Sequence, residues 1–360
     1  MHEFDFTAFR DQGIERIGEL NPYITLACDL RCRYCYMYDF LENADNKLEL
    51  MEPDFLFGLI NFFSDSGNGL DRMTLLGGEP TLHPDITEII DVISNMPIKE
   101  KRMTTNGIGT HHLKLEKLKP EALDHISVSI DGTNPETNDS TRGKGTFEKI
   151  LETIGKYSQS GIKLSINYTV TSKNLSQLNE VVSFFAEKGV SIINFHRASL
   201  DGYAYANPDL IVKASDWINA RDNLSTYIHN NSQQFPGLTI RIPYIFLTPR
   251  QIEQLNYKPI QEQNYHSLQG GHRLIVFPPT KKGRGLCYMS SDLIGQPNAE
   301  LGYVTSSGSF VWNEHQSNEF TAYARSASSN VSTEIKNQSG EIDLANILRV
   351  SHSFKAVINT

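Results

Sequence analysis

Short apolar runs alternate with longer amphipathic stretches over the first 200 residues, and this alternation restricts the fold more than any other feature. Candidate strands are 23–27, 73–76, 102–105, 126–130, 164–170 and 192–195. Helical patterns lie between them at 53–63, 86–94, 113–118, 146–157 and 175–188. Leu178, Val181, Val182 and Phe185 have the spacing of a helix stripe that faces a core. Six strand–helix units in succession predict an α/β fold with a parallel sheet and right-handed crossovers.

Periodicity leaves open whether this sheet stays flat or curls into a barrel. In both arrangements the active site lies at the carboxyl ends of the strands. Polar and glycine-rich motifs follow several of the predicted strands directly. We therefore expect those motifs to meet at one edge of the sheet.

The alternation changes after about residue 200. A helix is expected at 216–227 and a strand at 238–247, followed by a loop-rich stretch over 258–300. Residues 303–305 and 310–312 flank Ser-Ser-Gly and predict a β-hairpin. The Ser- and Asn-rich segment 326–340 is expected to be a surface loop. We predict a core at 1–235 and a C-terminal α+β extension at 236–360.

Charge and hydropathy exclude several classes of protein. The chain has 42 acidic and 33 basic residues, a formal charge of −9, which argues against nucleic acid as a partner bound through many phosphate contacts. No apolar stretch reaches membrane-spanning length, so no membrane partner is expected. The start, Met-His-Glu-Phe-Asp-Phe, lacks the features of a secretory signal. We expect a cytoplasmic protein whose thiols stay reduced.

Three of the four cysteines lie within eight residues, in Cys28-Asp-Leu-Arg-Cys32-Arg-Tyr-Cys35, directly after the first predicted strand. Thiolates are soft ligands that suit iron–sulfur clusters or zinc. Structural zinc requires four protein ligands, and the fourth cysteine, Cys287, is more than 250 residues away. The spacing therefore indicates metal ligation, with a Cys₃His zinc site as the alternative to a cluster.

The cysteine spacing and several later motifs together resemble the radical S-adenosylmethionine (SAM) superfamily. The motifs occur in order over roughly residues 20–200, and they are Gly77-Gly78-Glu79-Pro80, Thr104-Thr105-Asn106-Gly107, Ser127-Val-Ser129-Ile-Asp131-Gly132, Arg142-Gly143 and Gly145-Thr-Phe147. The resemblance implies a partial (β/α)6 TIM-like barrel. It also implies one [4Fe–4S] cluster on Cys28, Cys32 and Cys35, SAM as cofactor, and a reducing partner such as flavodoxin or ferredoxin.

The resemblance implies that several residues contact SAM. Gly77 and Gly78 permit close backbone approach, and Glu79 is expected to pair with the ammonium group of SAM. Taken alone, this tetrapeptide would read as a turn that ends a strand. Tyr34, which precedes the last cysteine, is expected to lie against the adenine.

Polar residues at the ends of later strands complete the predicted SAM site. Thr105 and Asn106 end the third strand, and other expected contacts are Ser129, Asp131, Asn167 near the ribose, Arg142 near the carboxylate, and His196 after the sixth strand. A surface ion pair is the alternative for Arg142. A structural role is the alternative for His196, which Arg197 follows.

The C-terminal region resembles the SPASM and twitch extensions of one subgroup but departs from them. Trp312 and Asn313 stand at the end of the predicted hairpin, where the subgroup presents a cysteine. The extension is therefore expected to cover the substrate without holding a second cluster. Cys287 is interpreted either as a buried apolar residue or as a hydrogen-atom donor that quenches a substrate radical. Lys281, Lys282 and Arg284 are interpreted as a solvated loop or an anion contact.

The resemblance implies an enzyme that abstracts hydrogen from a substrate carbon. Loss of the auxiliary cysteines favours a small polar metabolite, such as a sugar, nucleoside or amino-acid derivative. A peptide-modifying enzyme, or an epimerase that uses Cys287, is the first alternative. A non-catalytic protein that keeps a metal cluster for structure is the alternative from another class.

Overall fold

The computed structural model describes residues 17–42, 49–65, 69–200, 202–242, 246–247, 273–279, 283–288, 294, 300–313 and 342–343. The expected surface loop at 326–340, Lys281 and Lys282 lie outside the described residues, as does most of the stretch 258–300. None of the described helices combines the length and the hydropathy needed to cross a bilayer.

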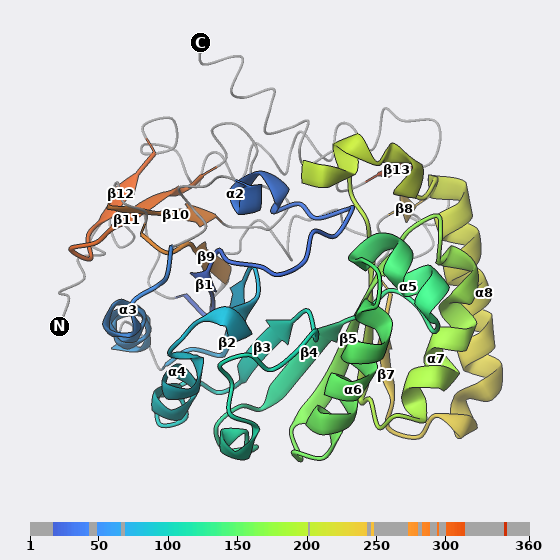
Figure 1. Cartoon of the computed structure of the whole chain (residues 1–360), viewed down its shortest axis with the longest axis horizontal. Helices are drawn as coiled ribbons and strands as arrows, with labels where there is room; N and C mark the ends of the chain where they lie inside the picture. The colour runs from blue at the N-terminus through green and yellow to red at the C-terminus, as the bar shows by residue number, and fades with distance from the viewer. Residues whose placement is uncertain are drawn as a thin grey trace, which may run out of the picture.

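Parallel strands form an open arc, as the resemblance implies. They are β1 (Glu19–Thr25), β2 (Arg72–Gly77), β3 (Lys101–Thr105), β4 (His125–Ser129), β5 (Lys163–Val170), β6 (Ile192–Arg197) and β7 (Thr239–Arg241). Each strand pairs in parallel with the next one along the chain. The six predicted strands are all confirmed within a few residues. The arc does not close into a full barrel (Figure 1).

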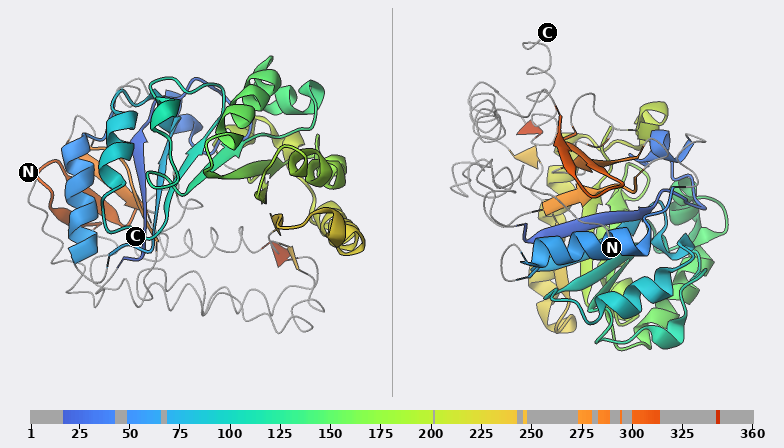
Figure 2. Two further views of the ribbon diagram at one scale, coloured as in Figure 1. Left: turned by 90° about the horizontal axis from the view of Figure 1, so that it is seen from below. Right: turned by 90° about the vertical axis from the view of Figure 1, so that its left-hand side faces the viewer.

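Helices cover the outer face of this arc (Figures 1 and 2). They are α3 (Pro53–Asp65), α4 (Ile86–Ile93), α6 (Thr146–Ser158), α7 (Leu178–Ala186) and α8 (Ala214–Asn231). Two further helices, α2 (Tyr38–Glu42) and α5 (Pro135–Arg142), lie near the carboxyl ends of the strands. Single 3₁₀ turns are η1 (Pro80–Leu82), η2 (Leu115–Lys117), η3 (Leu175–Gln177), η4 (Gly202–Ala206), η5 (Pro208–Leu210) and η6 (Ser232–Gln234).

Two expectations about helices differ from the structure. The helix expected at 113–118 is only the 3₁₀ turn η2, because Pro120 disfavours helical backbone at the residue before it and closes the segment early. Helix α5 was not predicted, since its residues Pro-Glu-Thr-Asn-Asp-Ser-Thr-Arg show no apolar periodicity. Its start does carry a signal: Asn134 caps the helix through the N–H of Thr137, with proline at the first helical position.

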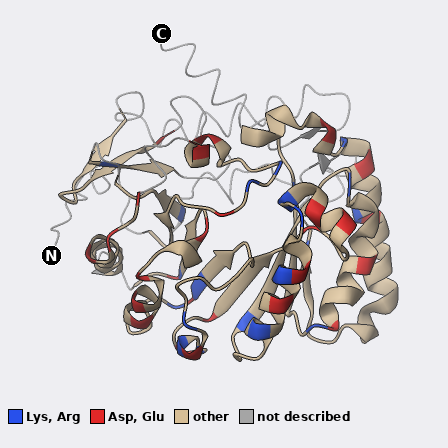
Figure 3. Cartoon of the chain, in the orientation of Figure 1, with Lys and Arg blue, Asp and Glu red and all other residues tan. Residues whose placement is uncertain are grey.

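Side chains alternate between two different environments along each strand. Outward residues such as Met103, Ile126 and Ile166 are fully buried in the hydrophobic core beneath the helices. Inward residues are polar and pair across strands. The hydroxyls of Ser127 and Ser165 lie 2.7 Å apart, and the Nδ2 of Asn194 donates to Oδ1 of Asn167 at 3.1 Å. The inner wall of the arc is therefore hydrophilic, while the outer face supplies the stability of the fold. Figure 3 shows basic and acidic residues interspersed on the outer helix α6.

The C-terminal region extends the same sheet. Strand β9 (Arg273–Val276) pairs in parallel with β1, and β10 (Arg284–Tyr288), β11 (Gly302–Thr305) and β12 (Phe310–Trp312) follow in antiparallel order. The predicted hairpin is thus confirmed as β11 and β12. Two further described strands, β8 (Phe246–Leu247) and β13 (Ile342–Asp343), pair separately. Strands from both sides of residue 235 share one sheet, so the predicted division into a core and a covering extension stays a prediction.

His125 at the start of β4 makes stability sensitive to acid. Its side chain is 1% exposed, and no residue in the described part of the chain hydrogen-bonds to its ring nitrogens. Burial, together with the charge of Arg102, lowers its pKa to about 4. The unfolded chain takes up the proton near pH 6.5, so acidification favours unfolding. This contribution is complete above pH 6.5 and is lost as the pH falls toward 4, at up to about 3 kcal/mol.

We therefore expect His125→Gln to flatten the pH dependence of the unfolding free energy between pH 6.5 and 4, measured by urea denaturation. His229→Gln is the matched control, because His229 is exposed on α8. An unchanged slope in His125→Gln would show that the imidazole takes no part in acid unfolding.

Candidate active site

The three clustered cysteines lie on the loop that follows β1, at the carboxyl ends of the parallel strands. In Figure 1 this blue segment runs across the mouth of the arc toward α5 and then returns to α2. Cys28, Cys32 and Cys35 are each partly buried, and all three line a cavity of roughly 430 Å³. The same cavity is lined by ten other predicted site residues: Tyr34, Gly77, Gly78, Glu79, Thr105, Asn106, Ser129, Arg142, Asn167 and His196.

The glycines after β2 allow the loop to approach the strand. A Cβ atom on Gly78 would lie 2.3 Å from the carbonyl oxygen of Ala27 and 2.9 Å from Cβ of Cys28. A Cβ atom on Gly77 would lie 2.6 Å from the carbonyl oxygen of Thr25. Because the shortest of these contacts are with backbone carbonyl oxygens, no side-chain movement would relieve them. The glycine pair therefore sets the height of the first cysteine above the sheet.

Glu79 joins the ends of two strands. Its carboxylate is fully buried and accepts hydrogen bonds from the N–H of Asn106 at 2.6 Å and the hydroxyl of Thr105 at 2.8 Å. The N–H and hydroxyl of Thr81 donate to the same carboxylate at 3.1 and 2.7 Å. Burial raises its pKa, although these hydrogen bonds oppose the shift. Glu79 thus fixes the turn after β2 to the end of β3, and pairing with an ammonium group stays a prediction.

The three cysteines form a set of soft thiol donors at one place in the fold. Burial raises the pKa of Cys28 and of Cys35 to about 12 and also raises that of Cys32. Within the described ranges, no three His, Cys, Asp or Glu side chains converge closely enough to hold one metal ion. In a cluster, each of the three thiolates would bind a different iron.

A polar network supports the first cysteine from the side of β3. The Nδ2 of Asn106 lies 4.0 Å from Sγ of Cys28 and donates to the carboxylate of Asp29 at 2.6 Å. His111 approaches the second oxygen of Asp29 at 3.1 Å, with a backbone φ of 46° that is unusual for a residue with a side chain. Asn106 is therefore placed to donate to a cluster ligand while it also holds the loop.

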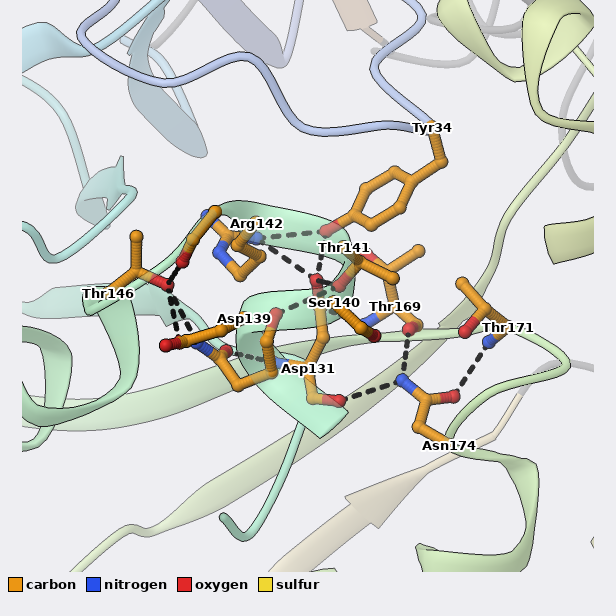
Figure 4. Close-up of polar contacts among 12 residues, drawn as sticks. Tyr34, Asp131, Asp139, Ser140, Thr141, Arg142, Thr146, Thr169, Thr171 and Asn174 are labelled. Atoms are coloured by element: carbon orange, nitrogen blue, oxygen red, sulfur yellow. Dashed lines mark hydrogen bonds and ion pairs between the residues drawn. The ribbon is translucent and has the colours of Figure 1, made fainter. Parts of the chain in front are cut away.

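A second network supports Tyr34 from the opposite side (Figure 4). The hydroxyl of Tyr34 donates to Oδ2 of Asp131 in a short hydrogen bond. Nη1 of Arg142 donates to the Tyr34 hydroxyl at 2.9 Å and lies 3.5 Å from the same Asp131 oxygen. Arg142 and Tyr34 line the cavity, but Asp131 does not. Asp131 thus lies behind Tyr34 and Arg142, which contact its carboxylate, and a direct contact with a cofactor stays a prediction.

The far wall of the cavity comes from β4, β5 and β6. Ser129 and Asn167 are register partners on β4 and β5, and Thr169 of β5 is the register partner of His196 on β6. Asn167 accepts the hydrogen bond from Asn194 described above. His196 projects into the cavity, and the surrounding protein lowers its pKa by desolvation. An imidazole and a carboxamide therefore face the cavity together.

Cys287 lies outside this cavity. It is on β10, completely buried in the hydrophobic core, and its S–H donates to the carbonyl of Gly285 at 3.6 Å. Burial raises the pKa of its thiol. The geometry therefore favours the packing role and does not bring Cys287 to the site as a hydrogen donor. Arg284 lies over the ring of Tyr303 at 4.6 Å, which suits a packed surface residue.

Two tyrosines of the site were not predicted. The hydroxyls of Tyr23 on β1 and Tyr36 after the last cysteine lie 2.6 Å apart, and both residues line the cavity. Tyr23 is 1% exposed and reads in the sequence as an ordinary core residue of a strand. The contact between the two hydroxyls forms because the cysteine loop returns over β1, and no local sequence pattern indicates that return.

Comparison with known proteins agrees with this geometry. The sequence model of the radical SAM superfamily matches residues 23–185. This region of the chain is therefore a radical SAM domain, of the superfamily whose members use a 4Fe–4S cluster together with SAM. The matched region contains all three clustered cysteines, the end of β1 and β2 through β5, and it excludes β6, β7 and the C-terminal strands β9 to β12.

Individual relatives and structures extend the comparison. A probable GTP 3′,8-cyclase of Sulfurisphaera tokodaii is 32% identical over 197 residues, which are 52% of this chain and 60% of that protein. This chain thus spans less than two thirds of the relative's length. Streptococcus suis SuiB bound to SAM superposes with a TM-score of 0.63 at 17% identity, covering 84% of this chain and 66% of that one.

A third similarity covers nearly the whole chain. The structure of anSMEcpe with bound AdoMet and Cp18Cys peptide superposes with a TM-score of 0.60 at 16% identity, over 96% of this chain and 98% of that one. At such identities the two structural similarities establish a shared fold. They agree with the parallel arc and the C-terminal antiparallel strands of this protein.

The glycine after β2 provides a test of the loop geometry. We expect Gly78→Ala to lower the iron content after anaerobic reconstitution severalfold, because its Cβ would push the backbone of Ala27 and the side chain of Cys28 away. Gly155→Ala is the matched control. A Cβ there meets nothing within 4 Å, and removing a helical glycine stabilises by about 0.5–1 kcal/mol. Equal iron content in both variants would contradict a positional role for Gly78.

Proposed function

We propose that this protein is a radical SAM enzyme that abstracts a hydrogen atom from a small polar metabolite in a biosynthetic reaction. One observation carries this proposal. Three cysteine thiols and ten motif residues line the same cavity, and they come from the loop after β1, from β2 to β6 or the turns that follow these strands, and from α5. A protein that kept a cluster only for structure would need the cysteines but not the polar side chains that converge around them.

Cys28, Cys32 and Cys35 would hold three irons of the cluster. When bound, the cluster and SAM supply a 5′-deoxyadenosyl radical that abstracts hydrogen. Arg142 is placed to bind a carboxylate, because its Nε is buried and, in the part of the chain that the structure describes, has no hydrogen-bond partner. Ser129 and Asn167 present a hydroxyl and a carboxamide to the same cavity. These groups would bind and orient the ligand.

The inner wall supports a polar substrate. Thr104, Thr169 and His196 face the cavity beside Ser129 and Asn167, so hydrogen-bonding groups outnumber apolar ones on the strand side. A volume of roughly 430 Å³ lies in the ordinary range of small-molecule sites. The similarity to a probable GTP 3′,8-cyclase makes a nucleotide the first substrate class to test.

A peptide substrate is the second candidate. The SuiB and anSMEcpe folds extend over most of this chain, and one of those structures contains a bound peptide. We favour the small metabolite because Cys287 is the only cysteine outside the cluster loop, and it is sequestered in the core. The one-electron donor is proposed to be a flavodoxin or a ferredoxin.

Anaerobic turnover tests the proposal directly. The reconstituted protein is incubated with dithionite, SAM and deuterated nucleosides or nucleotides, GTP first. We expect formation of 5′-deoxyadenosine with deuterium transferred from one position of a nucleotide. Cys32→Ser is expected to abolish this product, since the cluster loses a ligand. Cys287→Ser is the matched control and keeps the iron content of the wild type.

Two outcomes would contradict the proposal. Zinc instead of iron and sulfide in the purified protein, with no spectral response to SAM, would end the enzyme interpretation. Deuterium transfer from a peptide, with none from any metabolite, would shift the assignment to the peptide-modifying branch.

A further inference from the structure

The buried carboxylate of Asp131 lies at the centre of a network that no cofactor needs to touch. Its side chain is fully buried, and its two oxygens accept from different elements. Oδ1 accepts from the backbone N–H of Thr169 on β5 at 3.0 Å. Oδ2 accepts from the hydroxyl of Thr141 on α5 at 3.2 Å and from Tyr34 on the cysteine loop. One carboxylate thus joins β4, β5, α5 and the loop that carries the cluster ligands.

The backbone of Asp131 is held as firmly as its side chain. Its N–H donates to Oδ1 of Asn138 at 3.0 Å, and its carbonyl accepts from Nδ2 of Asn174 at 2.8 Å. Nδ2 of Asn174 also donates to the carbonyl of Thr169 at 2.9 Å. Figure 4 shows these contacts around Asp131, with Tyr34 reaching down from the loop above. The carboxylate is therefore a fixed point against which the loop is placed.

Arg142 brings a positive charge to the cluster side of this network. Its guanidinium is 5% exposed, contacts both Tyr34 and Asp131, and lines the cavity beside Cys32. The N–H of Arg33, the residue after Cys32, donates to the carbonyl of Thr141, the residue before Arg142, at 2.9 Å. The ion pair of Arg142 and Asp131 therefore lies close to the segment that carries Cys32, and its two charges have opposite signs.

We propose that Asp131 is a positioning residue that anchors the cysteine loop through Tyr34 and offsets the charge of Arg142 beside Cys32, and so sets the reduction potential of the bound cluster. This inference rests on the assignment of the three cysteines as cluster ligands. Its physical basis is that the potential of an iron–sulfur cluster depends on nearby charge and on hydrogen bonding around its ligands. A positive charge favours the reduced cluster, and a negative charge favours the oxidised one.

Removing the charge of Asp131 and removing the charge of Arg142 are expected to shift the midpoint potential of the cluster in opposite directions. Asp131→Asn keeps the shape and removes the negative charge, so the midpoint potential is expected to become more positive. Arg142→Gln removes the positive charge, so the potential is expected to become more negative. Removing one charge near a buried site is expected to change the ratio of reduced to oxidised cluster roughly tenfold at a fixed applied potential. That ratio corresponds to about 59 mV for a one-electron couple.

The measurement is a redox titration of the reconstituted protein followed by EPR in the absence of SAM, together with the iron content of each variant. Asp139→Asn is the matched control. Asp139 is a nearby carboxylate that caps the start of α6 through the N–H groups of Gly145 and Phe147, and no described contact joins it to Tyr34 or Arg142. Its removal is expected to lower thermal stability and leave the potential unchanged.

Further variants separate anchoring from charge. Tyr34→Phe removes the hydroxyl that links loop and carboxylate, and is expected to lower the iron content without the shift seen in Asp131→Asn. If Asp131→Asn holds too little iron for titration, the double variant with Arg142→Gln is used. Its charges balance again, so a potential close to the wild type is expected.

Shifts of the same sign in Asp131→Asn and Arg142→Gln would overturn the inference, because a merely structural role loosens the loop in both. A shift in Asp139→Asn as large as that in Asp131→Asn would do the same. Failure of the double variant to recover the wild-type potential is a third contrary result. If the wild-type protein itself binds no iron, the proposed function fails, and that result is distinct from these three.

Discussion

The pairing of β1 with its neighbours is the constraint on which the rest of the structure depends. This strand is buried along almost its whole length, and it pairs in parallel with β2 on one side and β9 on the other. It therefore joins the arc that builds the cavity to the antiparallel strands of the C-terminal region. Its end also supports the cysteine loop. A shift in β1 would move Cys28 relative to Gly78, where the backbones leave no space for adjustment.

Much of the fold could be predicted because its strands and helices are encoded locally. Apolar runs located β2 to β6 within a residue or two, and glycine or polar motifs after them located the site. What could not be predicted depends on contacts between distant segments. The position of Asp131 behind Tyr34 joins residues 97 apart in sequence. The continuation of the sheet through β9 depends on pairing between residues about 250 apart.

Other differences between the predicted and the observed structure have local causes that hydrophobic periodicity does not reveal. Helix α5 is polar throughout most of its length and is defined by its cap at Asn134. The sequence left two interpretations of Cys287 open, because no sequence pattern distinguishes a lone cysteine in a core from one at the mouth of a cavity. Only the register of β10 with β9 and β11 places it inside. Site residues were thus found by motif, while their partners required the three-dimensional fold.

The last cysteine of the loop is held by a segment made much later in the chain. The carbonyl oxygen of Cys35 accepts the N–H of Tyr203 at 3.0 Å, and Tyr203 stacks on Tyr38 with ring centroids 4.1 Å apart. Gly202 fits against the same carbonyl with a backbone φ of 50°. During synthesis, the three thiols therefore leave the ribosome long before the residues that shape their loop. The loop can take its final shape only after β6 and η4 have been made, because the contact with Tyr203 forms last.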